Sequence, residues 1–307
     1  MCGKTSHGWC CCEGARVDYW ANFQTQYNKD GLAEDIGRIV KRRLGNPSGK
    51  ARHAAYYGPC LRHHADLENI LFYNTGVWGL GVVTPGNPCI RFEHCRERPL
   101  NRPPEDNFTH CYSYWLRETD EYPWFKGQKP EVVIDVRLRD PKDLDNSKIV
   151  WYAVKDQVKR ECTKPGTAMN GSPIKDEERL GISATISVPA PTRKRGYHVK
   201  PIFDGIAAAL HYWDDKEKKD EIIRKLDGVS RVVGVPVDDL YRLFTNEQGC
   251  LLGPKMIMDN RKKPQLNPDD HRIGAGELIL SKNNPSDTAL CVRIYRLPTA
   301  AECRGAQ

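Results

Sequence analysis

Hydrophobic and polar residues alternate strictly at two places in the second half of the chain. Residues 132–139 carry valine, isoleucine or leucine at alternate positions, mostly with charged side chains between them. Residues 181–188 alternate in the same way, with serine and threonine as the polar partners. A period of two residues predicts strands with one buried and one polar face. Shorter strands are predicted at residues 77–83, 90–93, 112–116, 256–258, 277–280 and 290–297.

A helical period is clearest at residues 31–44, where an apolar stripe recurs every three or four residues and Gly45 marks the end. Shorter helices are predicted at residues 66–73, after Asn146, and at residues 201–213, 221–226 and 237–244. Residues 1–30 are aromatic, rich in cysteine and aperiodic, and are interpreted as an extended arm. Because strands and helices interleave without a regular βαβ rhythm, the pattern predicts an α+β fold with mixed or antiparallel sheet segments and packed helices.

The chain has 307 residues, which is enough for one large domain or two of medium size. A proline-bearing loop at residues 123–130 suggests a boundary between two α+β halves, residues 1–127 and 128–307, with one continuous domain as the alternative. No run approaches 18 apolar residues, and no apolar run follows the N-terminus, so neither a membrane span nor a secretory signal is expected. We therefore expect a cytoplasmic protein without a membrane partner. The pattern leaves the oligomeric state open.

The net charge of +7 favours polyanionic partners such as nucleic acid, with a solvated basic surface as the alternative. The basic residues form three clusters: Arg38, Lys41, Arg42, Arg43, Lys50 and Arg52; Arg193, Lys194, Arg195 and Lys200; Arg261, Lys262 and Lys263. Aromatic residues offer stacking surfaces for bases near Arg117 and Lys126, or else an aromatic core or hairpin. They are Tyr112, Tyr114, Trp115, Tyr122, Trp124 and Phe125.

Twelve cysteines are present, and the densest group is Cys2, Cys10, Cys11 and Cys12. Zinc sites usually have paired cysteines matched by a second pair downstream, and this group has no such partner. Free thiols in a reducing cytosol are therefore the favoured interpretation, and a zinc site is the alternative.

Three short acidic segments each open an expected helix: residues 66–69 (DLEN), 143–146 (DLDN) and 202–205 (IFDG). Acidic residues two apart at such a junction can direct two carboxylates at one hard cation. The recurrence suggests an internally duplicated unit. The alternative role is helix capping, since Asp, Asn and Gly at a helix start satisfy free backbone NH groups and an acid meets the positive end of the helix dipole.

Residues 200–205 (KPIFDG), the DLDN segment, and acids further along at Asp156 and at residues 214–215 resemble RusA-type Holliday-junction resolvases. That family carries Lys-Pro, an Asp-x-Asp-Asn helix start and downstream aspartates whose carboxylates bind magnesium beside the scissile phosphate. The third segment departs from this pattern, with isoleucine and glycine where an acid and asparagine are expected.

The resemblance implies a divalent-metal-dependent nuclease that uses Mg²⁺. The implied metal ligands are Asp143, Asp145 and Asp204, and Lys200 joins them as a catalytic residue that contacts phosphate. The basic clusters supply the candidate nucleic-acid-binding residues, which are Arg193, Lys194, Arg195, Arg42 and Arg43.

Two other function classes stay open. One is a non-enzymatic binding or interaction protein with a basic surface, in which the acidic segments are caps. The other is an enzyme acting on small molecules through cysteines and histidines that the sequence does not single out. His63-His64, His198, His211 and His271 lie near acidic residues and are candidate general bases or ligands, with ordinary surface or hydrogen-bonded histidines as the alternative. Convergence of the three aspartates would favour the nuclease, and their dispersal would favour the binding protein.

Overall fold

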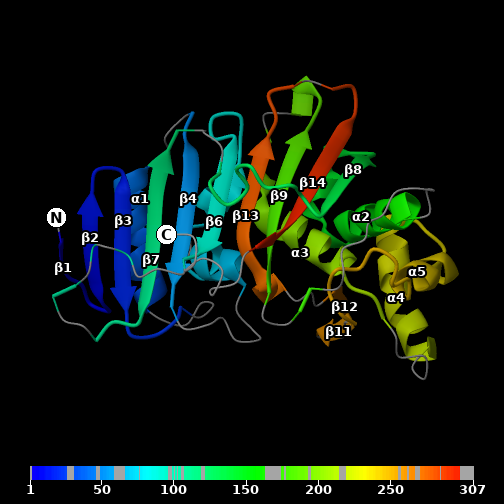
Figure 1. Ribbon diagram of the computed structural model, residues 1–307, viewed down its shortest axis with the longest axis horizontal. Helices are drawn as coiled ribbons and strands as arrows, with labels where there is room; N and C mark the ends of the chain where they lie inside the picture. The colour runs from blue at the N-terminus through cyan, green and yellow to red at the C-terminus, as the bar shows by residue number, and fades with distance from the viewer. Residues whose placement is uncertain are drawn as a thin grey trace.

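The computed structural model describes residues 2–297 with internal gaps. The gaps are residues 26–30, 46–48, 59–65, 76, 96–98, 100, 102, 105–106, 119–121, 163–173, 176–177, 193–194, 214–218, 255–256, 261–262, 267–269 and 284. The prediction of an α+β fold is confirmed, because helices pack against a large sheet of mixed parallel and antiparallel strands (Figure 1).

Within the described residues, ten strands form one sheet in the order β1-β2-β3-β7-β4-β6-β13-β9-β14-β8. The first-half strands are β1 (Cys2–Lys4), β2 (Trp9–Glu13), β3 (Arg16–Ala21), β4 (Ala51–Tyr57), β6 (Cys89–His94) and β7 (His110–Arg117). The second-half strands are β8 (Val132–Leu138), β9 (Arg179–Ser187), β13 (Ile273–Leu280) and β14 (Thr288–Leu297). Two small ribbons pair β5 (Val82–Val83) with β10 (Tyr197–His198) and β11 (Ile257–Asn260) with β12 (Lys263–Leu266).

Four strands of each half have the same arrangement. In the first half, β4 is parallel to β6 and antiparallel to β7, which in turn pairs antiparallel with β3. In the second half, β9 is parallel to β13 and antiparallel to β14, which pairs antiparallel with β8. The third strands, β6 and β13, join the two halves as an antiparallel pair. Strands of the 1–127 and 128–307 halves thus belong to one continuous sheet, and its order in one half is the reverse of its order in the other.

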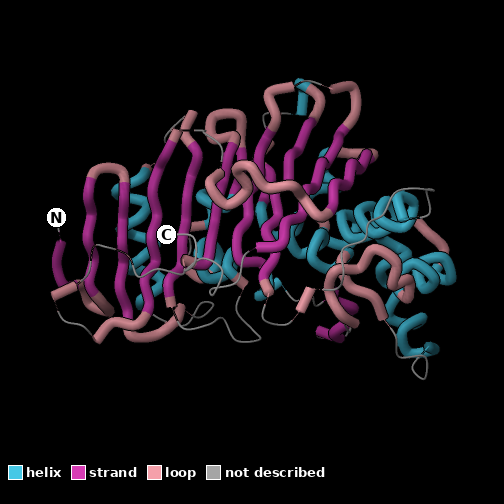
Figure 2. The backbone as a smooth tube through the Cα atoms, viewed as in Figure 1, coloured by secondary structure: helices cyan, strands magenta, loops and turns pink. Residues whose placement is uncertain are grey.

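The helices also follow this repeat, and those beside the sheet lie on its far face in Figures 1 and 2. The helix α1 (Gly31–Leu44) lies between the first and second strands of the first half, and α2 (Ser147–Cys162) does so in the second. The π-helical turn η1 (Asn69–Tyr73) follows β4, and α3 (Val199–Ala209) follows β9. Two further helices, α4 (Lys219–Val233) and α5 (Val237–Phe244), pack beside α2 at the right-hand end of the view.

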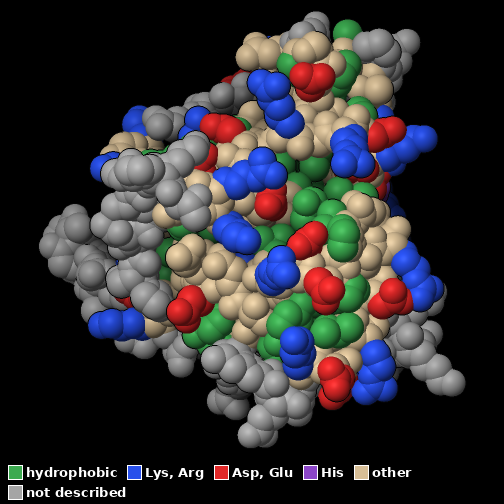
Figure 3. All heavy atoms as spheres, turned by 90° about the vertical axis from the view of Figure 1, so that its right-hand side faces the viewer, with side chains coloured by type: hydrophobic (Ala, Val, Ile, Leu, Met, Phe, Trp, Pro, Cys, Tyr) green, Lys and Arg blue, Asp and Glu red, His purple; other side chains and the backbone are tan. Residues whose placement is uncertain are grey.

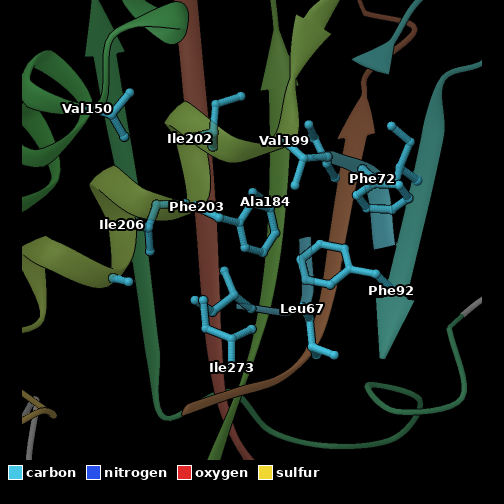
Figure 4. Packing of buried hydrophobic residues seen from close by; sticks show 14 of the residues in the cluster. Leu67, Phe72, Phe92, Val150, Ala184, Val199, Ile202, Phe203, Ile206 and Ile273 are labelled. Carbon is cyan, nitrogen blue, oxygen red and sulfur yellow. The ribbon is translucent and has the colours of Figure 1, made fainter. Parts of the chain in front are cut away.

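An aromatic cluster fills the core where the halves meet. Phe92 of β6 makes edge-on contacts with Phe72 and Phe203, with ring centroids 6.0 Å and 5.0 Å apart (Figure 4). The opposite residue on β13 is Gly276, and a Cβ there would lie 2.1 Å from Phe92 Cζ. Glycine at this position therefore allows one aromatic ring to cross from the first half onto the second.

Several predicted elements differ from the structure. The seven residues 51–57 form β4, which alternation did not predict because six of its seven residues are buried. The predicted strand at 77–83 is wrong over most of its length. It begins with the 3-10 turn η2 (Trp78–Gly81), and a Cβ on Gly81 would contact Phe72 at 3.3 Å. The expected arm at 1–30 contains strands β1 to β3 at the edge of the sheet.

Candidate functional site

The third acidic segment lies in the first half of α3. Lys200 is in the first turn and Asp204 follows four residues later, so both side chains project from the same side of the helix. Lys200 Nζ lies 3.1 Å from Asp204 Oδ1. Residue 201 is a proline, which the first turn accepts because its NH group needs no partner within the helix.

The first acidic segment reaches the same ammonium group from the other half of the chain. Lys200 Nζ lies 3.5 Å from Asp66 Oδ2 and 3.7 Å from Glu68 Oε1. Asn69 donates a hydrogen bond from its side chain to Asp66. Three carboxyl groups from two distant segments therefore surround one lysine, and Asp66, Glu68, Asp204 and Lys200 are named here the carboxylate cluster.

The position of the cluster follows from the repeated strand order. Glu68 follows β4, the second strand of the first half, and Asp204 follows β9, the second strand of the second half. The pairing of β6 with β13 places these two structurally related segments beside each other. The acidic positions of the two segments therefore meet in one place instead of forming two separate sites.

Burial dominates the electrostatics of the cluster. The Glu68 side chain is fully buried, and neither of its oxygens has a hydrogen-bond partner. Burial raises the pKa of Glu68 to about 8, and the attraction of Lys200 offsets only part of this rise. Burial also raises the pKa of Asp204, and the attraction of Lys200 offsets only part of this rise.

A single ammonium group cannot neutralise three carboxylates. With its raised pKa, Glu68 holds a proton at neutral pH for most of the time, which reduces the uncompensated negative charge. The cluster is still open to solvent at Lys200 and Asp204, whose side chains are 28% and 23% exposed. Chemically, the arrangement can bind a proton or an additional cation from solution.

The second acidic segment lies elsewhere. Asp143 accepts a hydrogen bond from the backbone NH of Asp140 and forms a capping box at the start of the 3-10 turn η3 (Pro141–Asp145). Asp145 accepts a hydrogen bond from Arg195. This segment follows β8, the first strand of its half, so it occupies a different position in the repeat from the other two.

The structure therefore brings together Asp204 and Lys200 of the predicted site and gives Asp143 and Asp145 other partners. Across the described residues, no three His, Cys, Asp or Glu side chains form a group arranged to hold a metal ion. The residues that sequence reasoning left out of its site are Asp66 and Glu68. Their signal was present in the DLEN segment, but only the strand pairing places it next to residue 204.

The predicted nucleic-acid-binding residues have different environments. Arg42 and Arg43 are exposed in the last turn of α1, whereas Arg195 is paired with Asp145. Arg193 and Lys194 lie outside the described residues. On the face that carries α4 and α5, basic and acidic side chains are interspersed and do not form an area of one sign (Figure 3).

The aromatic and histidine candidates also lie in different environments. Tyr112 and Tyr114 are fully buried, as an aromatic core requires, and Trp115 is partly exposed on the opposite face of β7. His211 is buried, and its Nδ1 lies 2.7 Å from the carbonyl oxygen of Gly253. His63-His64 and residues 214–215 lie outside the described residues.

One pair of cysteines differs from the expectation of free thiols. Cys2 and Cys11 are cross-strand partners on β1 and β2 and form a disulfide, so the expectation of free thiols is wrong for these two. The other described cysteines are not in disulfides: Cys10, Cys12, Cys89, Cys95, Cys111, Cys162, Cys250 and Cys291.

No protein-family model and no curated protein matches this chain. None of the described helices is long and apolar enough to cross a membrane.

Proposed function

We propose that this protein processes nucleic acid as a divalent-metal-dependent nuclease, with the carboxylate cluster as its site. The observation that carries the proposal is Glu68, a fully buried carboxyl group without a hydrogen-bond partner, beside two further carboxyl groups and a lysine. A buried carboxylate without a hydrogen bond is costly, and the ammonium group of Lys200 at 3.7 Å offsets only part of that cost, so a bound cation would remove more of it.

The donor set fits a hard cation such as Mg²⁺, which prefers oxygen ligands and is typically held by one or two carboxylates together with substrate phosphate. Asp66, Glu68 and Asp204 would hold it once Lys200 Nζ, which lies within 3.7 Å of all three carboxyl groups, moves away, because as they stand the described residues form no group arranged to hold a metal ion. When bound, the metal would stabilise charge on the phosphate and lower the pKa of a water molecule. Lys200, displaced from among the carboxyl groups, would then lie beside the site, where its ammonium group would bind a phosphate oxygen. The exposed Arg42 and Arg43 add a basic surface on α1.

A second candidate function is a non-enzymatic nucleic-acid-binding or interaction protein. It is favoured by the separation of Asp143 and Asp145 from Asp204. It is also favoured by the position of Lys200, which already lies within ion-pair distance of all three carboxyl groups of the cluster. In this case the lysine is the permanent counter-ion, and the cluster fastens η1 to α3. The exposed arginines then provide the contact surface.

A cleavage and binding assay on branched, double-stranded and single-stranded nucleic acids separates these functions. It compares Mg²⁺, Mn²⁺ and EDTA for the unmodified protein and for the variants Glu68→Gln and Asp204→Asn. The nuclease predicts metal-dependent cleavage that falls roughly 100-fold or more in both variants, because each loses charge that stabilises the transition state. Asp143→Asn and Asp145→Asn are matched controls that keep their activity.

A direct titration with Mn²⁺ adds a readout that does not depend on turnover. The nuclease predicts binding that Glu68→Gln and Asp204→Asn weaken and the two control variants leave unchanged. Nucleic-acid binding without cleavage, combined with no Mn²⁺ binding, supports the second function and excludes the first.

A further inference from the structure

The face of the sheet away from α3 carries one row of directly paired residues that crosses both halves. In the first half the row contains Arg16, Trp115, His53 and Arg91, on strands β3, β7, β4 and β6. In the second half it contains Glu277, Ser183, Arg293 and Val133, on strands β13, β9, β14 and β8. Arg91 and Glu277 are the pair that joins the halves. Corresponding strands therefore place Trp115 and Arg293, and likewise His53 and Ser183, at equivalent positions.

The first-half part of the row is filled by stacked planar groups. The guanidinium of Arg16 lies 5.0 Å from the centre of the Trp115 ring, and Trp115 stacks on His53 at 5.2 Å. Arg91 Nε donates to Glu277 Oε1 at 2.7 Å, and both residues are buried. In this half the Trp115 ring therefore lies between the Arg16 guanidinium and the His53 ring.

The second-half part of the row is open. Ser183 is much smaller than His53, and its hydroxyl donates to Glu277 Oε2 at 2.9 Å. Arg293 is exposed at the position equivalent to Trp115. A pocket of about 810 Å³ lies here, and Arg91, Ser183, Glu277 and Arg293 all line it. Its volume is within the usual range for sites that bind small organic molecules.

The loop after β7 covers one side of this pocket. Tyr122 donates from its hydroxyl to the Phe92 carbonyl oxygen at 3.2 Å, and Phe125 stacks on Tyr295 with ring centroids 4.5 Å apart. Phe125 fits against the sheet because residue 181 is glycine, where a Cβ would lie 2.6 Å from the Phe125 ring. The loop therefore supplies an aromatic and aliphatic wall that is fixed before any ligand binds.

The pocket has an excess of positive charge. Arg91, Arg293 and Lys129 line it, against the single carboxylate of Glu277, which is already paired with Arg91. No carboxylate of the described residues lies within ion-pair distance of Arg293 or Lys129. Arg293 and Lys129 thus differ from Arg16, Arg91 and Arg296 of the same sheet, each of which is paired with a carboxylate.

We infer that this pocket binds a nucleoside phosphate. The base lies between the Arg293 guanidinium, which stands at the position equivalent to Trp115, and the wall that contains Phe125. Lys129 and Arg293 contact the phosphate, and Ser183 and Gln128 offer hydrogen-bonding groups in the same pocket. The ligand is a free nucleotide or the terminal nucleotide of a strand, because both present the same chemistry. This site is independent of the carboxylate cluster and of the proposed nuclease activity.

The test is isothermal titration calorimetry of the full chain with AMP and UMP in EDTA, which removes any contribution from a divalent cation. Inorganic phosphate and adenosine are titrated separately, since the pocket should bind each of them more weakly than the complete nucleotide. A 5′-phosphorylated oligonucleotide and its unphosphorylated form distinguish a strand end from a free nucleotide.

The decisive variants are Arg293→Glu and Lys129→Glu, which should each weaken nucleotide binding by about tenfold or more, since a charge-assisted hydrogen bond is lost. Arg293→Trp should also abolish binding by filling the pocket as Trp115 does. Arg137→Glu is the matched control. Arg137 is exposed on β8, on the same face of the sheet as Arg293, but it does not line the pocket. Loss of binding in Arg137→Glu to the same extent, or no binding of either nucleotide or the phosphorylated strand, would overturn the inference.

Discussion

The two halves of this chain share one strand order and use it differently. On the face away from α3, the first half fills its row with Arg16, Trp115 and His53, whereas the second half leaves a pocket beside Arg293. On the helical face, the first half contributes two acids to the carboxylate cluster, and the second contributes one acid and the lysine. A repeated backbone thus fixes where side chains stand, and the side chains alone decide whether that place is filled, empty or charged.

The largest expected effect is at the junction of the halves. Phe92→Ala should lower the free energy of unfolding by about 3–5 kcal/mol, because it removes a fully buried ring that packs against both halves. Urea denaturation measures this change. Gly276→Ala should destabilise the unmodified protein but cost less in the Phe92→Ala background, where the added methyl group has room. If the two substitutions changed the free energy of unfolding in a strictly additive way, the Phe92 ring would not link the halves.

The second prediction concerns the composite acidic cluster and pH. The pKa of Glu68 is raised to about 8 in the folded protein, so the folded state binds its proton more tightly than the unfolded state does. This contribution to stability is fully present below the ordinary pKa of glutamate, near 4.5, and is lost as the pH rises through about 8.

The free energy of unfolding should therefore fall with pH across this window, by at most about 1.4 kcal/mol per pH unit for this group. Glu68→Gln should flatten the slope, since the amide cannot ionise. Asp143→Asn is the control that keeps the slope of the unmodified protein. Denaturation curves at several pH values measure the effect, and an unchanged slope in Glu68→Gln would show that the pKa of Glu68 is not raised in the folded protein.

A third prediction compares the equivalent positions Trp115 and Arg293. Trp115→Ala should cost about 2 kcal/mol of unfolding free energy, since a partly exposed ring that stacks on His53 and under Arg16 is lost. Arg293→Ala should change it by less than about 0.5 kcal/mol, as is usual for an exposed side chain. Thermal and urea unfolding of both variants measure the difference. Equal costs would contradict the contrast between a filled and an open row.

An effect smaller than that of Trp115→Ala is expected just before the acidic segment that lies outside the cluster. Asp140→Ala should cost about 1 kcal/mol, because it removes the side chain that accepts a hydrogen bond from the Lys142 backbone NH in the capping box. Nucleic-acid cleavage and Mn²⁺ binding should not change. A loss of either would return the second segment to the functional site.

Much of the fold could be predicted from the sequence because local periodicity reports burial within one element. The alternation at residues 132–139 and 181–188 corresponds to β8 and β9, and the helical stripe at 31–44 corresponds to α1. The failure at β4 has the same cause. A strand whose residues are nearly all buried has no polar face, so its pattern carries no period of two.

The site could be predicted only in part. Lys200 and Asp204 are four residues apart on one helix, and this spacing is sufficient to bring them together. Nothing local connects them to Asp66 and Glu68, more than 130 positions earlier in the chain. Asp143 and Asp145 matched the motif more closely, yet they follow a strand with a different place in the repeat.

By itself, the sequence determined the strands with two distinct faces, the helix starts and the chemical types available at each acidic segment. Only the tertiary structure decided which segments meet, because strand pairing depends on contacts between residues far apart in the chain. The antiparallel β6–β13 pair places Glu68 beside Asp204 on one face and aligns Arg91 with Glu277 on the other. Long-range pairing of this kind leaves no periodic signal in either partner, and for this reason both the carboxylate cluster and the pocket become visible only in the folded chain.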